Sequence, residues 1–181
     1  MIYIYTDGAC SNNQSEQNFG GWAAILVYRD YIKKLSGHQE NTTNNRMEMT
    51  GVLEGLKSLK RHDIPVRVFS DSAYIVNGIN QKWYVNWRKN GWKNAKKEPV
   101  LNRDLWEAIL EHYEKCRNIE FIKIKGHVNL NSEPEIKKSY EKERKAFTDP
   151  LGIGEYRRHL EFNHMADELA VNAAKDGRIK E

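Results

Sequence analysis

Short apolar runs alternate with amphipathic stretches along this 181-residue chain, and the alternation predicts its elements. Runs rich in β-branched and aromatic residues predict strands at Ile2–Thr6, Gly20–Arg29, Tyr31–Ser36, Pro65–Phe69 and Ile119–Ile124. Apolar residues at helical spacing predict a helix that is entered at the polar residues Asn41–Asn45 and keeps its period from Met49 to about Lys60. They also predict helices at Ser72–Asn80, Trp83–Arg88, Leu101–Cys116 and His164–Lys175, the last stopped by Gly177. A hairpin followed by strand–helix–strand crossovers predicts an α/β fold, with a five-stranded mixed sheet and helices on both faces.

One stretch, residues 128–162, breaks this pattern, because it is polar and holds seven acidic and seven basic residues. Within it, Ser132-Glu133-Pro134-Glu135 predicts a capping box at the start of a helix of about three turns, ending before Asp149-Pro150. A flexible return at 151–154 would lead to a second helical stretch from about Glu155. A disordered surface loop is the alternative for the whole stretch.

Size and composition restrict the class of protein. A chain of this length is expected to form a single domain over residues 1–181, with a core that needs no disulfide. Cys10 and Cys116 form no recognisable disulfide pattern, which favours a reducing compartment. The sequence has no leader-like start and no run of about 18 apolar residues, so we expect a cytoplasmic protein without a membrane span.

The net charge of +4 is concentrated in one stretch. Residues 82–97 hold six basic side chains and no acidic one, whereas the rest of the chain has 23 basic and 25 acidic residues. The six are Lys82, Arg88, Lys89, Lys93, Lys96 and Lys97. Such a stretch favours a polyanionic partner, and a solvated lysine-rich face is the alternative.

Four carboxylates are expected to meet at one edge of the sheet. Asp7 ends the first predicted strand before Gly8, which would let the chain turn, and Asp71 follows the fourth. Glu48 and Asp167 each lie near the start of a helix. Ligands bind open α/β sheets in such strand-end crevices. Each acid alone could be a turn residue, a helix-start residue, an N-cap or a solvated residue, so the interpretation depends on their convergence.

Gly51 and Gly55 follow Glu48 on the same helical face. Glycine inside a helix costs about 1 kcal/mol relative to alanine, so a packing reason is expected. These two would let the helix press on the sheet and bring Glu48 to Asp7 and Asp71. Ionised carboxylates at close range repel one another unless a cation lies between them, and hard divalent cations prefer oxygen ligands.

The acids stand within five sequence signatures. In chain order these are Thr6-Asp7-Gly8-Ala9-Cys10, Thr42-Thr43-Asn44-Asn45-Arg46-Met47-Glu48, Ser70-Asp71-Ser72, Lys125-Gly126-His127 and Asp167-Glu168-Leu169-Ala170. Together and in this order they resemble type 1 ribonuclease H. Gln81–Trp106, with tryptophans among basic residues, resembles the basic protrusion of the bacterial enzymes. The resemblance covers nearly the whole chain apart from residues 128–162.

The resemblance implies a ribonuclease H-like fold and an endonuclease that cuts the RNA strand of an RNA–DNA hybrid, leaving 5′-phosphate and 3′-hydroxyl ends. Asp7, Glu48, Asp71 and Asp167 would hold two Mg²⁺ ions, for which Mn²⁺ would substitute. His127 matches the mobile histidine of the family, which assists proton transfer or product release; a lone histidine after a glycine is otherwise more often structural. A monomer is the family's default.

The resemblance also implies which residues contact the hybrid. Near the acids they are Cys10, Asn13, Thr43, Asn44 and Asn45. An asparagine can donate to and accept from a 2′-hydroxyl, the group that distinguishes RNA from DNA, although helix capping is the alternative for Asn44 and Asn45. On the protrusion, tryptophans that share a helical face would lie with lysines against the DNA strand, or else belong to the core. These residues are Trp83, Trp87, Lys89, Lys93, Lys96 and Lys97.

The chain departs from the family pattern in three places. Asp71-Ser72-Ala73 stands where the bacterial enzymes commonly have Asp-Ser-Gln, and there is one extra residue near Lys82. Residues 128–162 stand where the family usually has only a handful of residues. Two other classes of protein stay open, a hybrid-binding module without catalysis and a DNA-cutting nuclease of the same fold. The four carboxylates disfavour the first class, and the heptapeptide and the tryptophans disfavour the second.

Overall fold

The fold is built on a five-stranded mixed sheet in the order β3-β2-β1-β4-β5, seen in a computed structural model that describes residues 1–11, 18–149 and 151–179. The strands are β1 (Ile2–Ser11), β2 (Phe19–Tyr28), β3 (Tyr31–Glu40), β4 (Val66–Ser70) and β5 (Ile119–Lys123). The first three pair antiparallel, and β4 is parallel to both β1 and β5. The predicted α/β class and mixed sheet are confirmed.

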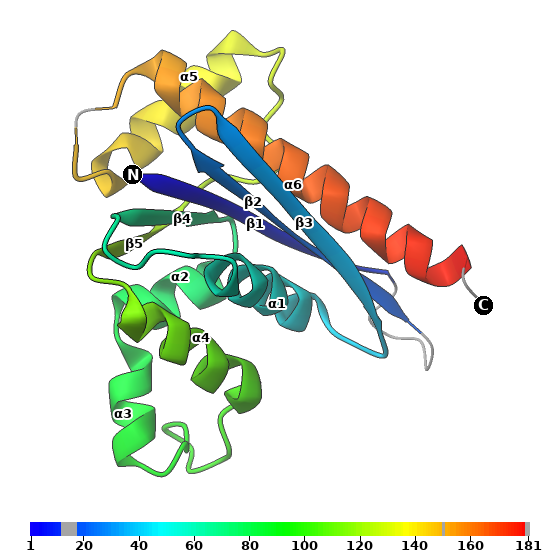
Figure 1. The fold of residues 1–181 in the computed structure, drawn as a ribbon, viewed down its shortest axis with the longest axis vertical. Helices are drawn as coiled ribbons and strands as arrows, with labels where there is room; N and C mark the ends of the chain where they lie inside the picture. The colour runs from blue at the N-terminus through cyan, green and yellow to red at the C-terminus, as the bar shows by residue number, and fades with distance from the viewer. Residues whose placement is uncertain (12–17, 150, 180–181) are drawn as a thin grey trace.

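Helices cover both faces of the sheet, as the sequence predicts (Figure 1). On one face lie α1 (Asn44–Lys57), α2 (Ala73–Asn80) and α4 (Arg103–Lys115). On the other face, α6 (Ile153–Ile179) crosses the long strands, and α5 (Glu133–Glu143) lies beside its beginning. The short α3 (Trp83–Lys89) and the loop after it extend away from the sheet.

The sheet separates two apolar cores, because successive strand residues point to opposite faces. Val68 of β4 packs in the core under α1, α2 and α4, whose largest buried ring is Trp106. Phe69, the next residue, packs in the core under α5 and α6. Gly51 and Gly55 let α1 press on the sheet as expected, since a Cβ on either would crowd atoms of β1 and β2.

Strand β1 is longer than the sequence predicts. Asp7 does not end it, because the strand continues to Ser11 and Asp7 pairs with Ala23 of β2. What ends near Asp7 is the pairing with β4, which extends only to Tyr5. Gly8 is therefore not a turn residue. It lets α1 approach instead, since a Cβ there would overlap backbone atoms of α1.

One helix, α6, replaces two predicted ones. The expected helix start near Glu155 is confirmed to within two residues, since α6 begins at Ile153. The expected start near His164 and the expected stop at Gly177 are wrong, because α6 runs without a break from Ile153 to Ile179. Its buried positions recur every three or four residues across both predicted stretches, which keeps one face on the sheet throughout. They include Tyr156, His159, Asn163, Ala166, Ala170 and Ala173.

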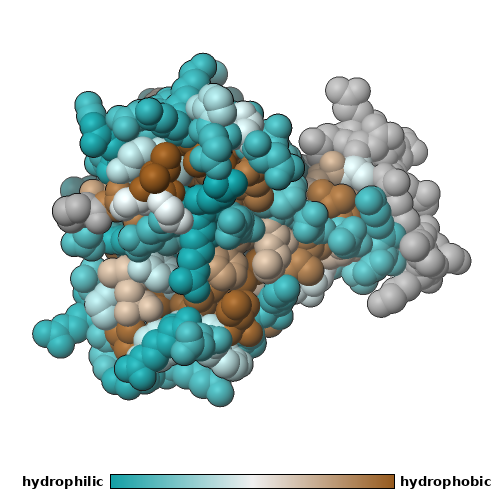
Figure 2. Space-filling view, turned by 90° about the horizontal axis from the view of Figure 1, so that it is seen from above, coloured by the Kyte–Doolittle hydropathy of each residue, from teal (hydrophilic) through white to brown (hydrophobic). Residues whose placement is uncertain are grey.

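Most of the 128–162 segment is ordered rather than a loop. Helix α5 has the predicted length, and a short 3-10 helix (Arg144–Ala146) follows it. Ser132 is the N-cap residue, but its side chain makes no capping hydrogen bond, so the predicted capping box is not formed. Leu151 is buried in the core under α6, so the expected flexible return is also wrong there. Hydrophilic residues dominate this side of the molecule, with hydrophobic ones visible between them (Figure 2).

Two smaller expectations concern membranes and disulfides. Within residues 1–11, 18–149 and 151–179, no helix has the length and apolar character needed to cross a bilayer. Cys10 and Cys116 are both free thiols.

Candidate metal centre and active site

Three carboxylates meet beside the end of β4. Asp7 lies in β1 two residues past its last pairing with β4, Asp71 directly follows β4, and Glu48 projects from the second turn of α1. One oxygen from each of the three lies within 4.8 Å of the others. We call Asp7, Glu48 and Asp71 the carboxylate trio. The convergence expected from the sequence is therefore present for these three.

Burial makes the ionised form of the carboxylate trio unfavourable unless a positive charge lies close by. Asp7 and Glu48 are only 6% and 5% exposed. Burial, and next the charge of Asp71, raises the pKa of Asp7 to about 8. Burial, and next the charge of Asp7, raises the pKa of Glu48, and burial also raises the pKa of Asp71.

The same site holds an oxygen without a partner. Glu48 Oε2 is buried and accepts no hydrogen bond from the described residues. A buried polar atom in this state is unfavourable unless something unseen binds it. A divalent cation would supply both the missing positive charge and the missing partner, so the residues present fit such an ion.

Asp167 and His127 border the carboxylate trio. The charge of Asp167 raises the pKa of both Asp7 and Asp71, although Asp167 is outside the group within 4.8 Å. His127 Nδ1 lies 3.8 Å from Asp167 Oδ2, and 78% of the histidine side chain is exposed. Asp7, Asp71, His127 and Asp167 line one small cavity. The site thus has an acidic floor and an exposed imidazole at its rim.

The turn that carries His127 is held close to the acids by an unusual backbone. A Cβ on Gly126 would overlap the carboxylate of Asp71, so a larger residue there would displace that carboxylate. His127 itself has φ 53°, in the left-handed region that residues other than glycine seldom adopt. The Lys125-Gly126-His127 signature therefore encodes both a close approach and a local strain.

Sequence reasoning missed Asn163 as a residue of this site. It is 4% exposed, its Oδ1 has no hydrogen-bond partner among the described residues, and it lines the cavity with Asp167. The four-residue spacing between the two places them on one face of α6. That spacing was the available signal, and it went unused because a helix start was expected at His164.

The predicted hybrid-contact residues near the acids gather at the start of α1. Thr43 is the N-cap residue and accepts from Arg46 N at 3.3 Å, so Asn44 and Asn45 are exposed in the first turn and do not cap the helix. Cys10 Sγ lies 3.6 Å from Thr42 O, which brings β1 to the same place. Asn13 falls outside the described residues.

The protrusion residues form a separate group around α3, which extends away from the sheet (Figure 1). The ring centroids of Trp83 and Trp87 lie 6.0 Å apart, and Trp87 also packs against Trp92 and Trp106. Trp87 is therefore partly a core residue, and the expected contact of the two tryptophans with DNA stays a prediction. The lysines are exposed and form no ion pair with the described residues; they are Lys89, Lys93, Lys96 and Lys97.

A mixed sheet with a carboxylate trio that is largely buried and fits a divalent cation defines an α/β protein with an acidic metal centre. The sequence model of the RNase H family matches residues 1–137. A ribonuclease H of Caldicellulosiruptor saccharolyticus is 54% identical over 126 residues, which cover 70% of this chain and 83% of that protein. One of Acetivibrio thermocellus is 48% identical over 126 residues, with 70% and 82% covered. The chain therefore belongs to the ribonuclease H family.

Solved structures show the same fold. An RNase H1 named LC11, solved in complex with RNA/DNA hybrid, superposes with a TM-score of 0.62 at 20% identity, covering 98% of this chain and 99% of that one. The N-terminal RNase H domain of a Mycobacterium tuberculosis protein superposes with a TM-score of 0.61 at 19% identity, covering 99% and 96%. At these identities the likeness concerns the fold alone, and it extends over the part of the chain that the family model does not match.

Proposed function

We propose that this protein is an endonuclease that hydrolyses the RNA strand of RNA–DNA hybrids, leaving 5′-phosphate and 3′-hydroxyl ends. The observation that carries the proposal is the carboxylate trio, with its raised pKa values and its unpartnered Glu48 oxygen. A binding module gains nothing from acids clustered against a phosphate backbone. Family membership and the hybrid bound to LC11-RNase H1 support the choice of substrate.

Asp7, Glu48, Asp71 and Asp167 would hold two Mg²⁺ ions, with Mn²⁺ as a substitute. Bound there, the ions would supply an activated water and charge stabilisation at the leaving 3′ oxygen. The protein's own part is to hold four oxygen-donor side chains in place and to keep Glu48 away from water. His127, exposed at the rim, would assist proton transfer or product release.

Two surfaces would bind the two strands. Thr43, Asn44 and Asn45 lie at the start of the helix that carries Glu48, so they are well placed to contact the 2′-hydroxyls of an RNA strand at the metal centre. Cys10 would contribute from the β1 side, and Asn13 is also proposed to contact the hybrid. The tryptophans and lysines around α3 would contact the DNA strand, whose phosphates attract the lysines. We also propose that residues 1–181 act as a single domain and as a monomer in the cytoplasm.

Cleavage of strand-labelled substrates tests this function. RNA–DNA hybrid, duplex DNA and duplex RNA are incubated with the protein in Mg²⁺, in Mn²⁺ and in chelator. The expected result is cleavage of only the RNA strand of the hybrid, and only with a divalent cation. Cutting of duplex DNA would identify a DNA nuclease of the same fold. Tight binding of the hybrid without cleavage in either metal would identify a binding module.

A further inference from the structure

The 128–162 segment reaches back to the turn that carries His127. Glu143, in the last turn of α5, accepts a hydrogen bond from the backbone N–H of Lys125 at 3.2 Å. Glu135, at the start of the same helix, lies 3.8 Å from the Lys125 ammonium group. Helix α5 therefore fixes both the backbone and the side chain of the residue two positions before His127.

The chain after His127 is fixed as well. Val128 is 7% exposed and belongs to the core under α5 and α6. Arg157 of α6 donates to the carbonyl oxygen of Leu130 at 2.8 Å. The exposed imidazole is thus carried by a turn that is held on both sides.

Glu143 is itself held from behind. The Tyr156 hydroxyl donates to Glu143 Oε2 at 2.7 Å, and because that hydrogen is used, the Ser139 hydroxyl donates to the Tyr156 oxygen at 2.6 Å. Tyr156 and Ser139 are 0% and 3% exposed. The carboxylate therefore accepts one hydrogen bond from a buried side chain and another from the turn.

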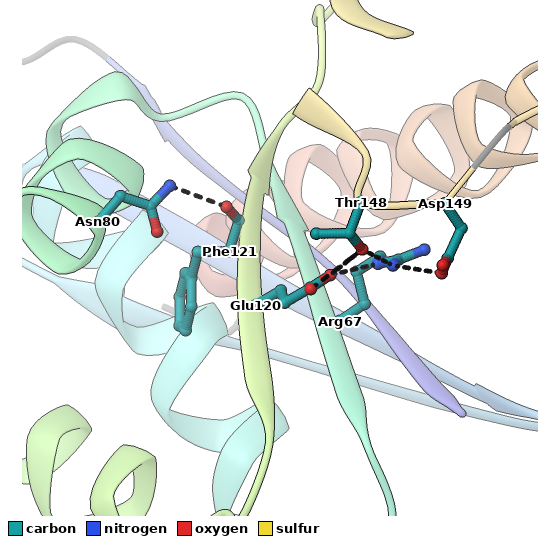
Figure 3. Close-up of polar contacts among 6 residues, drawn as sticks. All are labelled: Arg67, Asn80, Glu120, Phe121, Thr148 and Asp149. Carbon is teal, nitrogen blue, oxygen red and sulfur yellow. Dashed lines mark hydrogen bonds and ion pairs between the residues drawn. The ribbon is translucent and has the colours of Figure 1, made fainter. Parts of the chain in front are cut away.

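The middle of the segment, just after the 3-10 helix, is tied to the sheet by a second network (Figure 3). Arg67 of β4 is 4% exposed and donates to Glu120 of β5 at 2.9 Å and to Thr148 at 3.0 Å. It also pairs with Asp149 at 3.3 Å. The buried ring of Phe147 lies against the same arginine. Helix α5 is therefore followed directly by a fixed anchor, which limits how far Glu143 can move.

We propose that Glu143 is a positioning residue for hybrid cleavage: it fixes the Lys125–His127 turn and so keeps the imidazole beside Asp167. The proposal rests on the function proposed above. A hydrogen bond from a backbone N–H to a carboxylate is charge-assisted and stronger than a neutral one. It is the kind of contact that can stabilise a turn whose histidine adopts a left-handed backbone. Without it, the turn gains conformations in which His127 leaves the metal centre.

The test compares Glu143→Ala, Glu143→Gln and Glu141→Ala. Glutamine keeps an oxygen that can accept from Lys125. Glu141 is the matched control, because it is exposed on the same helix and, among the described residues, forms an ion pair only with Arg144. Three quantities are measured: kcat, KM for the hybrid at saturating Mg²⁺, and the hydrogen-exchange rate of the Lys125 amide.

Glu143→Ala is expected to lower kcat about tenfold, part of the roughly 10²–10⁴-fold that a placed proton-transfer group contributes, with KM unchanged. Its Lys125 amide should exchange at least about tenfold faster, the change expected when a hydrogen bond to a charged group is removed. Glu143→Gln should restore most of both quantities, and Glu141→Ala should match the wild type. Unchanged exchange or unchanged kcat in Glu143→Ala would overturn the proposal.

A second comparison separates positioning of His127 from a general effect on the fold. In a His127→Ala background, Glu143→Ala should lower kcat no further. An equal decrease in both backgrounds would overturn the proposal. If Glu143→Ala does not fold, Tyr156→Phe removes the hydroxyl that holds Glu143, and a smaller effect in the same pattern is expected; wild-type values would count against the proposal. If the wild type cuts no hybrid, the proposed function fails, and the exchange rates alone decide whether Glu143 fixes the turn.

Discussion

Replacement of Phe147 by alanine is expected to destabilise the protein by about 4–5 kcal/mol. Removal of a buried phenylalanine from a core costs about 3–5 kcal/mol. The upper part of that range applies, because the ring is 8% exposed and its centroid lies 6.0 Å from Phe69 and 5.9 Å from His159. Such ring pairs add about 0.5–1.5 kcal/mol each beyond their buried area.

In a chain of this size, 1 kcal/mol shifts the melting temperature by about 2–4 °C, so the expected fall in Tm is about 8–20 °C. Urea unfolding followed by circular dichroism measures the change in free energy, and thermal unfolding measures the change in Tm. Tyr31→Ala is the control, because Tyr31 is 66% exposed and should cost under about 1 kcal/mol. A destabilisation under about 1 kcal/mol for Phe147→Ala would refute the assignment of the 128–162 segment to the core.

Three further predictions concern the proposed hybrid-binding protrusion and the metal centre. Alanine at Lys89, Lys93, Lys96 and Lys97 should weaken hybrid binding and leave kcat unchanged. The slope of log affinity against log salt concentration should become shallower by about 0.9 for each phosphate that is no longer neutralised, whereas an unchanged affinity at low salt would show that these lysines form only a solvated face. The free energy of unfolding that Mg²⁺ adds should grow as the pH rises from 3.8 to about 8, because the metal-free fold is stabilised by the protonated Asp7 carboxyl and loses that stabilisation as the carboxyl ionises. Urea midpoints in Mg²⁺ and in chelator test this, and a difference between the two midpoints that does not change with pH would contradict it. Gly126→Ala should weaken Mg²⁺ binding measured by calorimetry, because the added methyl displaces the Asp71 carboxylate, and an unchanged affinity would contradict that reason.

The sequence predicts the sheet and the carboxylate trio well, for a physical reason. Five apolar runs and one amphipathic helix with Gly51 and Gly55 leave few ways to bury the apolar faces, and the glycines indicate which helix face meets the sheet. The metal centre follows, because Asp7 and Asp71 lie just beyond the paired residues of the parallel neighbours β1 and β4, and Glu48 lies on the same face of α1 as Gly51 and Gly55. What the local pattern does not reveal is that β1 continues past Asp7, because that continuation depends on pairing with β2.

The 128–162 segment is where local reasoning failed most. Gly152 and Gly154 indicate a break, yet α6 starts at Ile153 between them, because the buried stripe of Tyr156 and His159 continues into Asn163 and Ala166. The segment also contributes buried residues to the core under α5 and α6. Replacement of residues 131–161 by a short linker would remove five buried core residues, so loss of folding is the expected result. These five are Ile136, Phe147, Leu151, Tyr156 and Leu160.

The most direct test of the metal-centre assignment is cleavage of strand-labelled hybrid by Asp71→Asn beside the wild type across a range of Mg²⁺ concentrations. Asparagine keeps the shape of the side chain but removes the charge that would hold a cation. The account predicts that Asp71→Asn folds, binds the hybrid as tightly as the wild type and cuts its RNA strand at under about a hundredth of the wild-type rate. A rate above that level at any Mg²⁺ concentration would contradict the assignment of the carboxylate trio as the catalytic metal site.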